Sequence, residues 1–342
     1  MSTCLESTNC RTRGWQAEDR QSRATRGNAL IRFTIRRVAL SILTLWGLAS
    51  ATFFMLRVLV PGDPVSLALG ARATPEAIAR ARGELGLDDP LLVQYGRFLR
   101  ELASLDWGRS FVLNAPVSRV LGQRVMPSVL LIGYALLIAL AIGVPLAVVS
   151  AVRQNRTSDH VIRFITTFFF GMPSFWLGLM IALLFGLKLG WFPVSGYDEG
   201  VAGVFRTLTL PALTLGLSIV VLVTRTLRSN LIAVLSTDYI ENARSRGTAE
   251  RRVVGKLAMR NAIMPTLTLL AAIMGSLIGG TVVVEFVFQI PGAGSLLVQS
   301  IFHRDYQMVT ALTILAGSTV IVMGLLMDLL QAALDPRVRV AK

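Results

Sequence analysis

Six long apolar runs, separated by polar segments, dominate the hydrophobic pattern of this chain. They cover residues 38–60, 125–152, 162–187, 208–226, 264–288 and 308–332. Each run reaches or exceeds the roughly 18 predominantly apolar residues that mark a membrane-spanning helix. Prolines inside the runs do not argue against spans, because neighbouring helices can accommodate them in lipid. The pattern therefore predicts an all-α polytopic membrane protein with about six transmembrane helices.

The N-terminal end allows more than one interpretation. Residues 1–28 are rich in Ser, Thr, Arg and Gln without periodicity, which predicts a disordered cytoplasmic tail, while a start of translation near Leu30 fits equally well. Residues 29–60 contain the first transmembrane helix. Ala49-Ser50-Ala51 fits a signal-peptide cleavage site, but the apolar run extends beyond the roughly 7 to 15 residues of a signal core. We therefore expect an uncleaved anchor.

A mostly polar segment, residues 61–124, separates the first two spans. Pro61-Gly62-Asp63-Pro64 ends the first helix, since proline stops helices. Further on, apolar residues recur at helical spacing at Leu91, Leu92, Tyr95, Phe98, Leu99 and Leu102. This stripe predicts a helix that packs on the spans or lies on the membrane surface. Contact with an extracytoplasmic partner is the alternative.

The charged residues orient the spans. The chain is 53% hydrophobic and carries 34 Lys and Arg against 20 Asp and Glu, a net charge of +14. We expect no nucleic-acid partner, because the basic residues cluster at the ends of apolar runs, as the positive-inside rule requires. Short outer loops carry only Lys188, Arg206 and Arg304. Both termini, including residues 335–342, are therefore expected in the cytoplasm, and residues 61–124 outside it.

The most informative polar segment is residues 230–263, between the fourth and fifth spans. A short helix is predicted over 238–246, ending at Gly247, because glycine relieves the left-handed position after a helix. A second helix is predicted from about Glu250 to Asn261. The pair forms a basic helical hairpin with Arg244, Arg246, Arg251, Arg252, Lys256 and Arg260. It can either lie on anionic lipid or dock against a soluble partner.

The sequence offers little that could carry catalysis. Gly255-Lys256 is followed by Leu257 and lacks the upstream glycine of a phosphate-binding loop, so we expect no ATP hydrolysis on this chain. Nucleophile-elbow and zinc-protease motifs are missing as well. Cys4 and Cys10 both lie in the N-terminal tail, and His160 and His303 are isolated. We therefore predict no catalytic, cofactor or metal site.

Two features inside the spans suggest further roles. Glu285 and Asp328 lie late in the fifth and sixth spans, where a carboxylate can mark a proton path, although snorkelling or helix capping would also satisfy it. Ala271, Gly275 and Gly279 recur every four positions in the fifth span, as do Ala272, Ser276 and Gly280. Such spacing predicts close helix packing in lipid.

The hairpin also carries a recognisable motif. The stretch Glu241-Asn242-Ala243-Arg244-Ser245-Arg246-Gly247 resembles the E-A-A-x-x-x-G cytoplasmic loop of ABC importer permeases, with Asn242 in place of the second Ala. Leu257 stands where relatives often have His, and residues 1–28 have no counterpart. Beyond the hairpin, the chain after residue 30 resembles the first permease subunit of the dipeptide/oligopeptide/nickel family. The motifs are Pro61-Gly62-Asp63-Pro64, Leu85-Gly86-Leu87-Asp88, Val93-Gln94-Tyr95, Asp106-Trp107-Gly108-Arg109-Ser110, Pro173-Ser174-Phe175-Trp176-Leu177-Gly178, Gly190-Trp191-Phe192-Pro193-Val194-Ser195-Gly196, Leu210-Pro211-Ala212-Leu213-Thr214, Arg260-Asn261-Ala262-Ile263-Met264-Pro265, Asp305-Tyr306 and Leu334-Asp335-Pro336-Arg337.

This resemblance implies a type I ABC importer permease fold, with residues 125–334 as the permease core, in a bacterial plasma (inner) membrane. It implies a second homologous permease subunit, two cytoplasmic ABC ATPase subunits that hold ATP and Mg, and an extracytoplasmic substrate-binding protein. Short peptides are the implied cargo, with glutathione or nickel complexes as alternatives. The residues implied in ATPase docking are Asp238, Tyr239, Glu241, Ala243, Arg244, Arg246 and Gly247.

Two other classes of function remain to be compared with this interpretation. A secondary transporter driven by an ion gradient predicts inverted repeats and broken helices with charged sites at the membrane midplane. Neither feature is clear in the sequence. A membrane scaffold without transport is the third class.

Overall fold

A computed structural model describes residues 34–59, 74–84, 86–110 and 112–334. The predicted tail (1–28), the C-terminal segment (335–342) and the Pro61–Pro64 turn lie outside the described residues. In the described part, one pair of two-residue strands accompanies the helices. The elements are the first helix Thr34–Val58, which passes into η1 (Met55–Leu59), α3 (Pro75–Glu84), α4 (Leu91–Ala103), β1 (Arg109–Ser110), β2 (Ala115–Pro116), α5 (Val117–Val152), α6 (Thr157–Phe170), α7 (Ser174–Ile181), η2 (Ala182–Lys188), α8 (Val201–Leu235), α9 (Asp238–Ser245), α10 (Glu250–Arg252), η3 (Val253–Ala258), α11 (Met259–Phe288), α12 (Ala293–Phe302) and α13 (Tyr306–Leu334).

Five of the six predicted spans are single helices. The described chain contains 5 helices long and apolar enough to cross a membrane, and up to 6 spans if a bent pair counts as one. The third span, predicted as one helix over 162–187, is this bent pair. The chain bends by 105° between Thr157–Phe170 and Ser174–Lys188. Gly171 ends α6, and Pro173 starts α7 without an N–H to continue the ladder of hydrogen bonds.

The packing of α5 on α8 shows that the bent pair crosses the molecule. Gly216 of α8 lies against Ala135, and further along both helices Gly143 of α5 lies against Val223. Thr224 also donates a hydrogen bond to the Gly143 carbonyl over 3.3 Å. The two helices therefore run parallel in close contact, so the chain between them must return from one end to the other. The bent pair makes this return, which brings the number of crossings to six.

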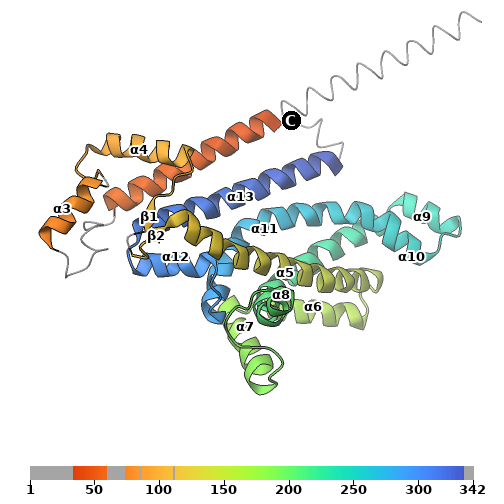
Figure 1. Ribbon diagram of the computed structural model, residues 1–342. Coiled ribbons are helices and arrows are strands. Elements are labelled where there is room, and N and C mark those ends of the chain that lie inside the picture. Colours follow the sequence, from red (N-terminus) through yellow and green to blue (C-terminus); the bar gives the residue numbers. More distant parts are fainter. Residues whose placement is uncertain (1–33, 60–73, 85, 111, 335–342) are drawn as a thin grey trace, which may run out of the picture.

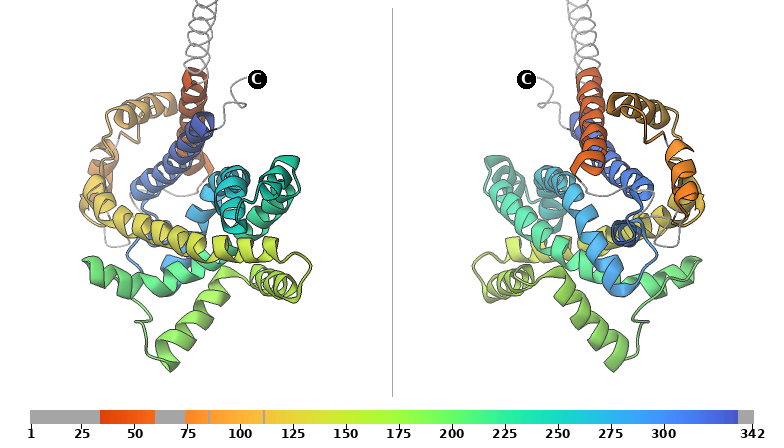
Figure 2. Two further views of the ribbon diagram at one scale, coloured as in Figure 1. Left: turned by 90° about the vertical axis from the view of Figure 1, so that its right-hand side faces the viewer. Right: turned by 90° about the vertical axis from the view of Figure 1, so that its left-hand side faces the viewer.

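Most connecting segments lie at two opposite ends of the molecule, while the segment between η2 and α8 projects at the bottom of the views (Figures 1 and 2). One end carries α9, α10 and the turn from α5 to α6, and the other carries α3, α4, β1, β2 and α12 (Figure 1). Along the side, the first helix contacts α13, where a Cβ placed on Gly317 would come within 2.0 Å of the Leu48 side chain. This arrangement places the predicted outer segment and the predicted hairpin at opposite ends.

The apolar stripe of the outer segment packs on the first helix, as the sequence predicts. Tyr95 and Phe98 of α4 both contact Phe53, with ring centroids 5.4 and 5.2 Å apart. The Tyr95 hydroxyl also hydrogen-bonds Ser50 over 2.6 Å. Leu92, by contrast, is 77% exposed, so part of the stripe remains free of contacts within the described chain.

A second contact at this end of the molecule joins β1 to the start of α13. Ser110 donates a hydrogen bond to the Asp305 carboxylate, and Asp305 also accepts from the Met308 N–H over 3.1 Å, which caps α13. The segment just before this cap differs from the prediction. The apolar runs left residues 289–307 as a short connecting loop, but residues Ala293–Phe302 form the helix α12. Its N-terminus is stabilised by a buried carboxylate described below.

Candidate functional site

The helix α9 has a well-defined C-terminal end. Gly247 follows it with φ at +78°, the left-handed conformation that the sequence predicts for this glycine. The Gly247 N–H bonds to the Arg244 carbonyl over 2.9 Å, and the Thr248 N–H bonds to the Ala243 carbonyl over 3.1 Å. This pair of bonds is a Schellman motif, and it turns the chain sharply towards α10.

One side chain anchors α9 to the bundle. Ile240 is the buried residue of this helix, with 0% of its surface exposed within the described chain. It lies in an apolar cluster contributed by α5, α8, η3 and α11, whose other members are Ala147, Ala151, Leu227, Leu231, Val253, Ala258 and Ala262. Because a helix of this length is not stable alone in water, this contact fixes the position of α9.

The other predicted docking residues form the outer surface of α9. Asp238, Tyr239, Glu241 and Arg246 are exposed together with Gly247, and Ala243 is half-buried. Arg244 is exposed as well, but it points back towards the hairpin. Six of the seven predicted residues are thus exposed on α9 and the turn that follows it, and Ala243 is half-buried.

Two polar contacts hold the hairpin closed. Arg244 donates two hydrogen bonds to the Glu250 carboxylate, over 2.6 and 3.1 Å. These bonds raise the pKa of the Arg244 guanidinium above its usual range. The Asn261 amide donates to the Tyr239 hydroxyl over 2.9 Å. Both contacts are exposed to solvent, so each stabilises the hairpin only modestly.

The second half of the hairpin differs from the prediction. A separate helix was expected from about Glu250 to Asn261, but one continuous helix runs over Glu250–Phe288 and includes the π-helical stretch η3. At a rise of about 1.5 Å per residue, it is longer than a bilayer core of about 30 Å. The hairpin is therefore a direct extension of the fifth span, with no hinge loop between them.

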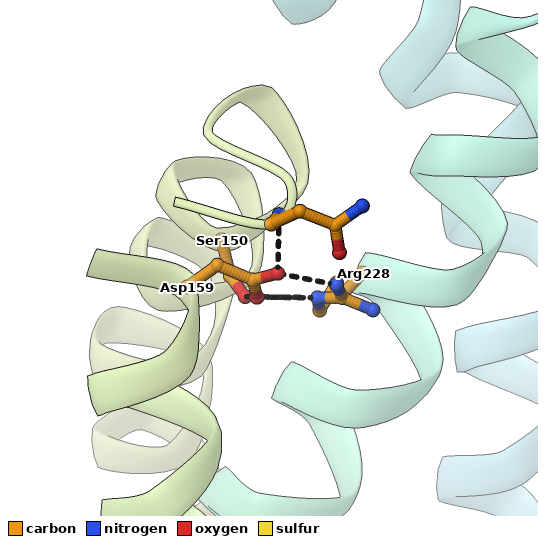
Figure 3. Close-up of polar contacts among 4 residues, drawn as sticks. Ser150, Asp159 and Arg228 are labelled. Carbon is orange, nitrogen blue, oxygen red and sulfur yellow. Dashed lines mark hydrogen bonds and ion pairs between the residues drawn. The ribbon is translucent and has the colours of Figure 1, made fainter. Parts of the chain in front are cut away.

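Behind the hairpin lies a buried ion pair that links three helices (Figure 3). Arg228 of α8 donates to both carboxylate oxygens of Asp159 in α6, over 2.8 and 2.6 Å. Ser150 of α5 donates to the same carboxylate and accepts from Arg228 over 3.0 Å. The Asn155 N–H adds a fourth bond over 3.0 Å. With 0% of the Asp159 side chain exposed, its charge is compensated entirely by these groups.

Sequence reasoning missed this joint between α5, α6 and α8. The positive-inside rule accounts for Arg228 as a basic residue at the end of an apolar run, and it gives Asp159 no role. The two residues are 69 positions apart, and neither belongs to a short motif. The available signal was Asp159 itself, an acidic residue in the first turn of a helix that follows the basic residues Arg153 and Arg156. Removing the Arg228 guanidinium costs about 3–5 kcal/mol, because the buried Asp159 carboxylate then loses its compensating charge.

The carboxylate of Glu285 is satisfied by helix capping, one of the two interpretations left open by the sequence. It is fully buried and accepts from the Ser128 hydroxyl over 2.6 Å and from the Ser295 N–H over 2.8 Å. The Ser128 oxygen in turn accepts from the Ala293 N–H over 2.9 Å. Glu285 therefore caps the N-terminus of α12 and ties it to α5. The side chain of Asp328 lies outside the described residues.

The predicted packing residues of the fifth span have different surroundings. A Cβ on Gly275 would lie 3.4 Å from Val320, so this glycine allows close approach to α13. Ala271 is half-buried. Gly279 is exposed, and a Cβ there would meet nothing within 4 Å in the described chain. Gly280, from the neighbouring row, lies closer to α8, where its Cβ would be 3.3 Å from Leu215.

Six apolar crossings, with one polar hairpin at a single end, define a multi-pass membrane protein. Comparison with known proteins gives the family. The chain belongs to the binding-protein-dependent transport system inner membrane components, whose pattern matches residues 143–340. A second pattern, for the N-terminal part of a binding-protein-dependent transport system membrane component, matches residues 30–123.

Relatives with assigned names are similar over nearly their whole length. A protein of Brucella abortus (strain 2308), named as a peptide transport system permease, is 38% identical over 308 residues, covering 89% of this chain and 98% of the relative. The oligopeptide transport system permease protein AppB of Bacillus subtilis is 35% identical, covering 90% and 98%. The glutathione transport system permease protein GsiC of Salmonella paratyphi A is 35% identical, covering 91% and 99%.

Family and fold together establish the class of function. The chain is a permease subunit of an ABC importer, with the type I importer fold, and is not a catalytic enzyme. Such a system includes ATPase and binding-protein components. The alternatives of an ion-gradient-driven transporter and of a scaffold do not agree with this family.

Proposed function

We propose that α9 is the docking element through which ATPase subunits drive this permease. The observation that carries the proposal is the contrast between its two faces. One face carries exposed polar and charged residues, and the other is fixed to the bundle by the fully buried Ile240. A helix seated in a groove of a partner would therefore pass any displacement to α5, α8 and α11.

The chemistry of this step is mechanical. ATP and Mg are held by two cytoplasmic ATPase subunits and by no residue of this chain. When the ATPase pair closes on ATP, its groove moves and α9 moves with it. Because the hairpin continues directly into α11, a displaced α9 tilts the fifth span and does not merely bend a loop. Access to the path then switches from the outer to the inner side.

The proposed assembly follows from this role. A second homologous permease subunit completes the path across the lipid bilayer, and an extracytoplasmic binding protein delivers cargo at the end that carries α3, α4 and α12. Both termini and α9 face the cytoplasm of a bacterial cell, with the chain in the plasma (inner) membrane. The basic residues of the hairpin support this orientation, since short inner segments are enriched in Arg and Lys.

We propose short peptides as the cargo. Three similar permeases are named for peptides. They are the peptide permease of Brucella abortus, the oligopeptide permease of Bacillus subtilis and the dipeptide permease DppB of Alkalihalophilus pseudofirmus. Glutathione, itself a small peptide, and nickel complexes are the alternatives. Identification of the ligand that copurifies with the binding protein tests this choice, and a nickel complex there would contradict it.

The docking role is tested by Gly247→Trp. A Cβ at Gly247 would meet nothing within 4 Å, so the bulky side chain leaves the bundle packing intact, and the strain of a side chain at φ +78° falls on the turn after α9. The side chain would, however, obstruct any partner that approaches the end of α9. We expect the variant to reach the membrane in normal amounts, to lose copurification with the ATPase and to lose uptake.

Gly247→Asn is the matched control for this variant. Asparagine tolerates the left-handed conformation better than other residues with a side chain, and it is small. We expect it to retain ATPase binding and most of the uptake. Wild-type uptake by Gly247→Trp at equal abundance would refute the docking role.

A further inference from the structure

We propose that the joint formed by Ser150, Asp159 and Arg228 transmits the displacement of α9 to the bent third span. This proposal rests on the proposed function and assigns positioning residues to it. The three side chains lie on α5, α6 and α8, and they meet at the end of the bundle that carries the hairpin (Figures 1 and 3). They are therefore placed between the element that is driven and the spans that must move.

The joint is directly behind the anchor of α9. Ile240 shares one apolar cluster with Ala147 and Ala151 of α5 and with Leu227 and Leu231 of α8. Ser150 stands between the two alanines in sequence, and Arg228 follows Leu227. The same turns of α5 and α8 thus carry the apolar contact with α9 and the polar contact with α6. A force applied at Ile240 reaches both helices where they hold Asp159.

The helix α6 depends on this joint for its attachment. Among its residues, all of which are described, Asp159 is the one that is buried. The apolar side chains of α6 point mostly away from the bundle, with Phe164 73% and Phe168 56% exposed. Apolar packing therefore contributes little to holding the driven end of α6, and the carboxylate with its four donors supplies the connection.

The far end of the bent span is embedded in the core. In α7, Leu177 and Ile181 are buried, and a Cβ on Gly178 would lie 3.2 Å from Phe288 of α11 and 3.3 Å from Thr214 of α8. The bent pair is thus held at one end by a single polar joint and at the other by close apolar packing. When α5 and α8 move, the end of the bent pair that carries Asp159 therefore moves with them.

The chemistry of the joint suits transmission. Apolar surfaces in a membrane can slide, because lipid tails compete equally well for the same contacts. The bidentate pair of a guanidinium and a carboxylate fixes both distance and direction. Lysine at position 228 would keep the charge and lose the fork, so the proposal separates geometry from charge.

The test uses the complete complex, reconstituted with its ATPase subunits and binding protein. In Asp159→Asn we expect normal copurification with the ATPase and continued ATP hydrolysis, but at least a tenfold loss of cargo transported per ATP hydrolysed. Arg228→Lys should show an intermediate loss. Asp88→Asn removes an exposed outer ion pair with Arg82 and serves as the matched control, with an unchanged ratio.

A purely structural role predicts a different result. Abundance, copurification and uptake would then fall together, and the ratio of cargo to ATP in the surviving protein would stay at the wild-type value. That outcome, or full coupling in both variants, overturns the transmission role. Absence of any ATPase binding by the wild-type chain would instead refute the docking function, so the two failures are distinguishable.

A spectroscopic measurement tests the same proposal without relying on activity. Spin labels at Phe164 of α6 and Ser236, both exposed, report the distance across the joint, with Cys4 and Cys10 replaced by serine. In the wild-type background we expect one narrow distance distribution that is the same with and without trapped nucleotide. In Asp159→Asn the distribution should broaden and depend on nucleotide. An unchanged distribution in the variant would contradict the proposal.

Discussion

At Gly292 the chain has room for a hydrogen atom on the Cα and for little more. A Cβ there would lie 2.3 Å from the Glu285 carboxyl, and one on Gly294 would lie 2.8 Å from the Val282 backbone. The two glycines allow the turn after α11 to fold over the buried carboxylate. They explain why the Pro-Gly-Ala-Gly stretch of residues 291–294 spans the start of α12.

Gly292→Ala should therefore lower the stability of the protein. The added methyl group displaces the Glu285 carboxylate from the Ser128 hydroxyl and the Ser295 N–H, and overpacking of this kind costs about 1–3 kcal/mol. Thermal unfolding in detergent measures the loss. Gly133→Ala in α5 is the control, because a Cβ at that exposed position meets nothing within 4 Å. Equal unfolding temperatures for the two variants would argue against a stabilising role of the Glu285 contacts.

Polar contacts between distant residues were beyond the reach of a single sequence. Glu285 and Ser128 are 157 positions apart, and Asp159 and Arg228 are 69 apart. Two polar residues that pair only when the fold buries them leave no periodic pattern in the sequence. A basic residue near the end of a span is also explained equally well by the positive-inside rule. By contrast, Gly247 was predictable because its requirement is local: a helix that ends in a left-handed residue favours glycine.

Among the elements, α9 depends most on tertiary contact. Isolated helices shorter than about 12–15 residues are marginal in water, and α9 is 8 residues long. Its stability must come from Ile240 in its apolar cluster, the Schellman motif and the contacts of Arg244 and Tyr239. Of these, the Ile240 contact is the one shielded from solvent.

Ile240→Ala should release α9 from the bundle. Truncation of a buried isoleucine to alanine costs about 2–5 kcal/mol, and here the cost falls on a short helix with few other contacts. We expect faster amide hydrogen exchange across residues 238–247, with unchanged exchange in α5 and α8. The exposed Asn242→Ala serves as the control and should leave α9 protected. Full protection of α9 in Ile240→Ala would show that another contact holds it.

The spans were predicted from their lengths, but the break in the third span was not, for a physical reason. Gly143-Val144-Pro145 and Gly171-Met172-Pro173 share one pattern, yet α5 continues through the first and the chain bends by 105° at the second. In α5, Gly143 packs tightly on Val223 of α8, which supports a continuous helix there. Proline in a membrane helix permits a break, and the packing of neighbours decides whether one forms.

At the scale of the whole molecule, α5 carries two polar contacts, one towards each end of its membrane-spanning part. Ser128 joins it to Glu285 and α12 at one end, and Ser150 joins it to Asp159 and Arg228 at the other. The two serines are 22 residues apart, which corresponds to roughly 33 Å of helix and matches the hydrocarbon thickness of a bilayer. This placement keeps both polar contacts near the membrane surfaces and leaves apolar packing between them.

That geometry makes the orientation of the chain testable with single cysteines. In a background with Cys4 and Cys10 replaced by serine, Leu92→Cys probes α4 and Ser245→Cys probes the end of α9; both positions are exposed, at opposite ends of the molecule (Figure 1). An impermeant maleimide should label Leu92→Cys in right-side-out vesicles, and Ser245→Cys in inside-out vesicles only. Each variant serves as the control for the integrity of the other's vesicles. If Ser245→Cys were labelled from the outside, no cytoplasmic ATPase could reach α9, and the coupling path from α9 through Ile240 to Asp159 would have no source of force.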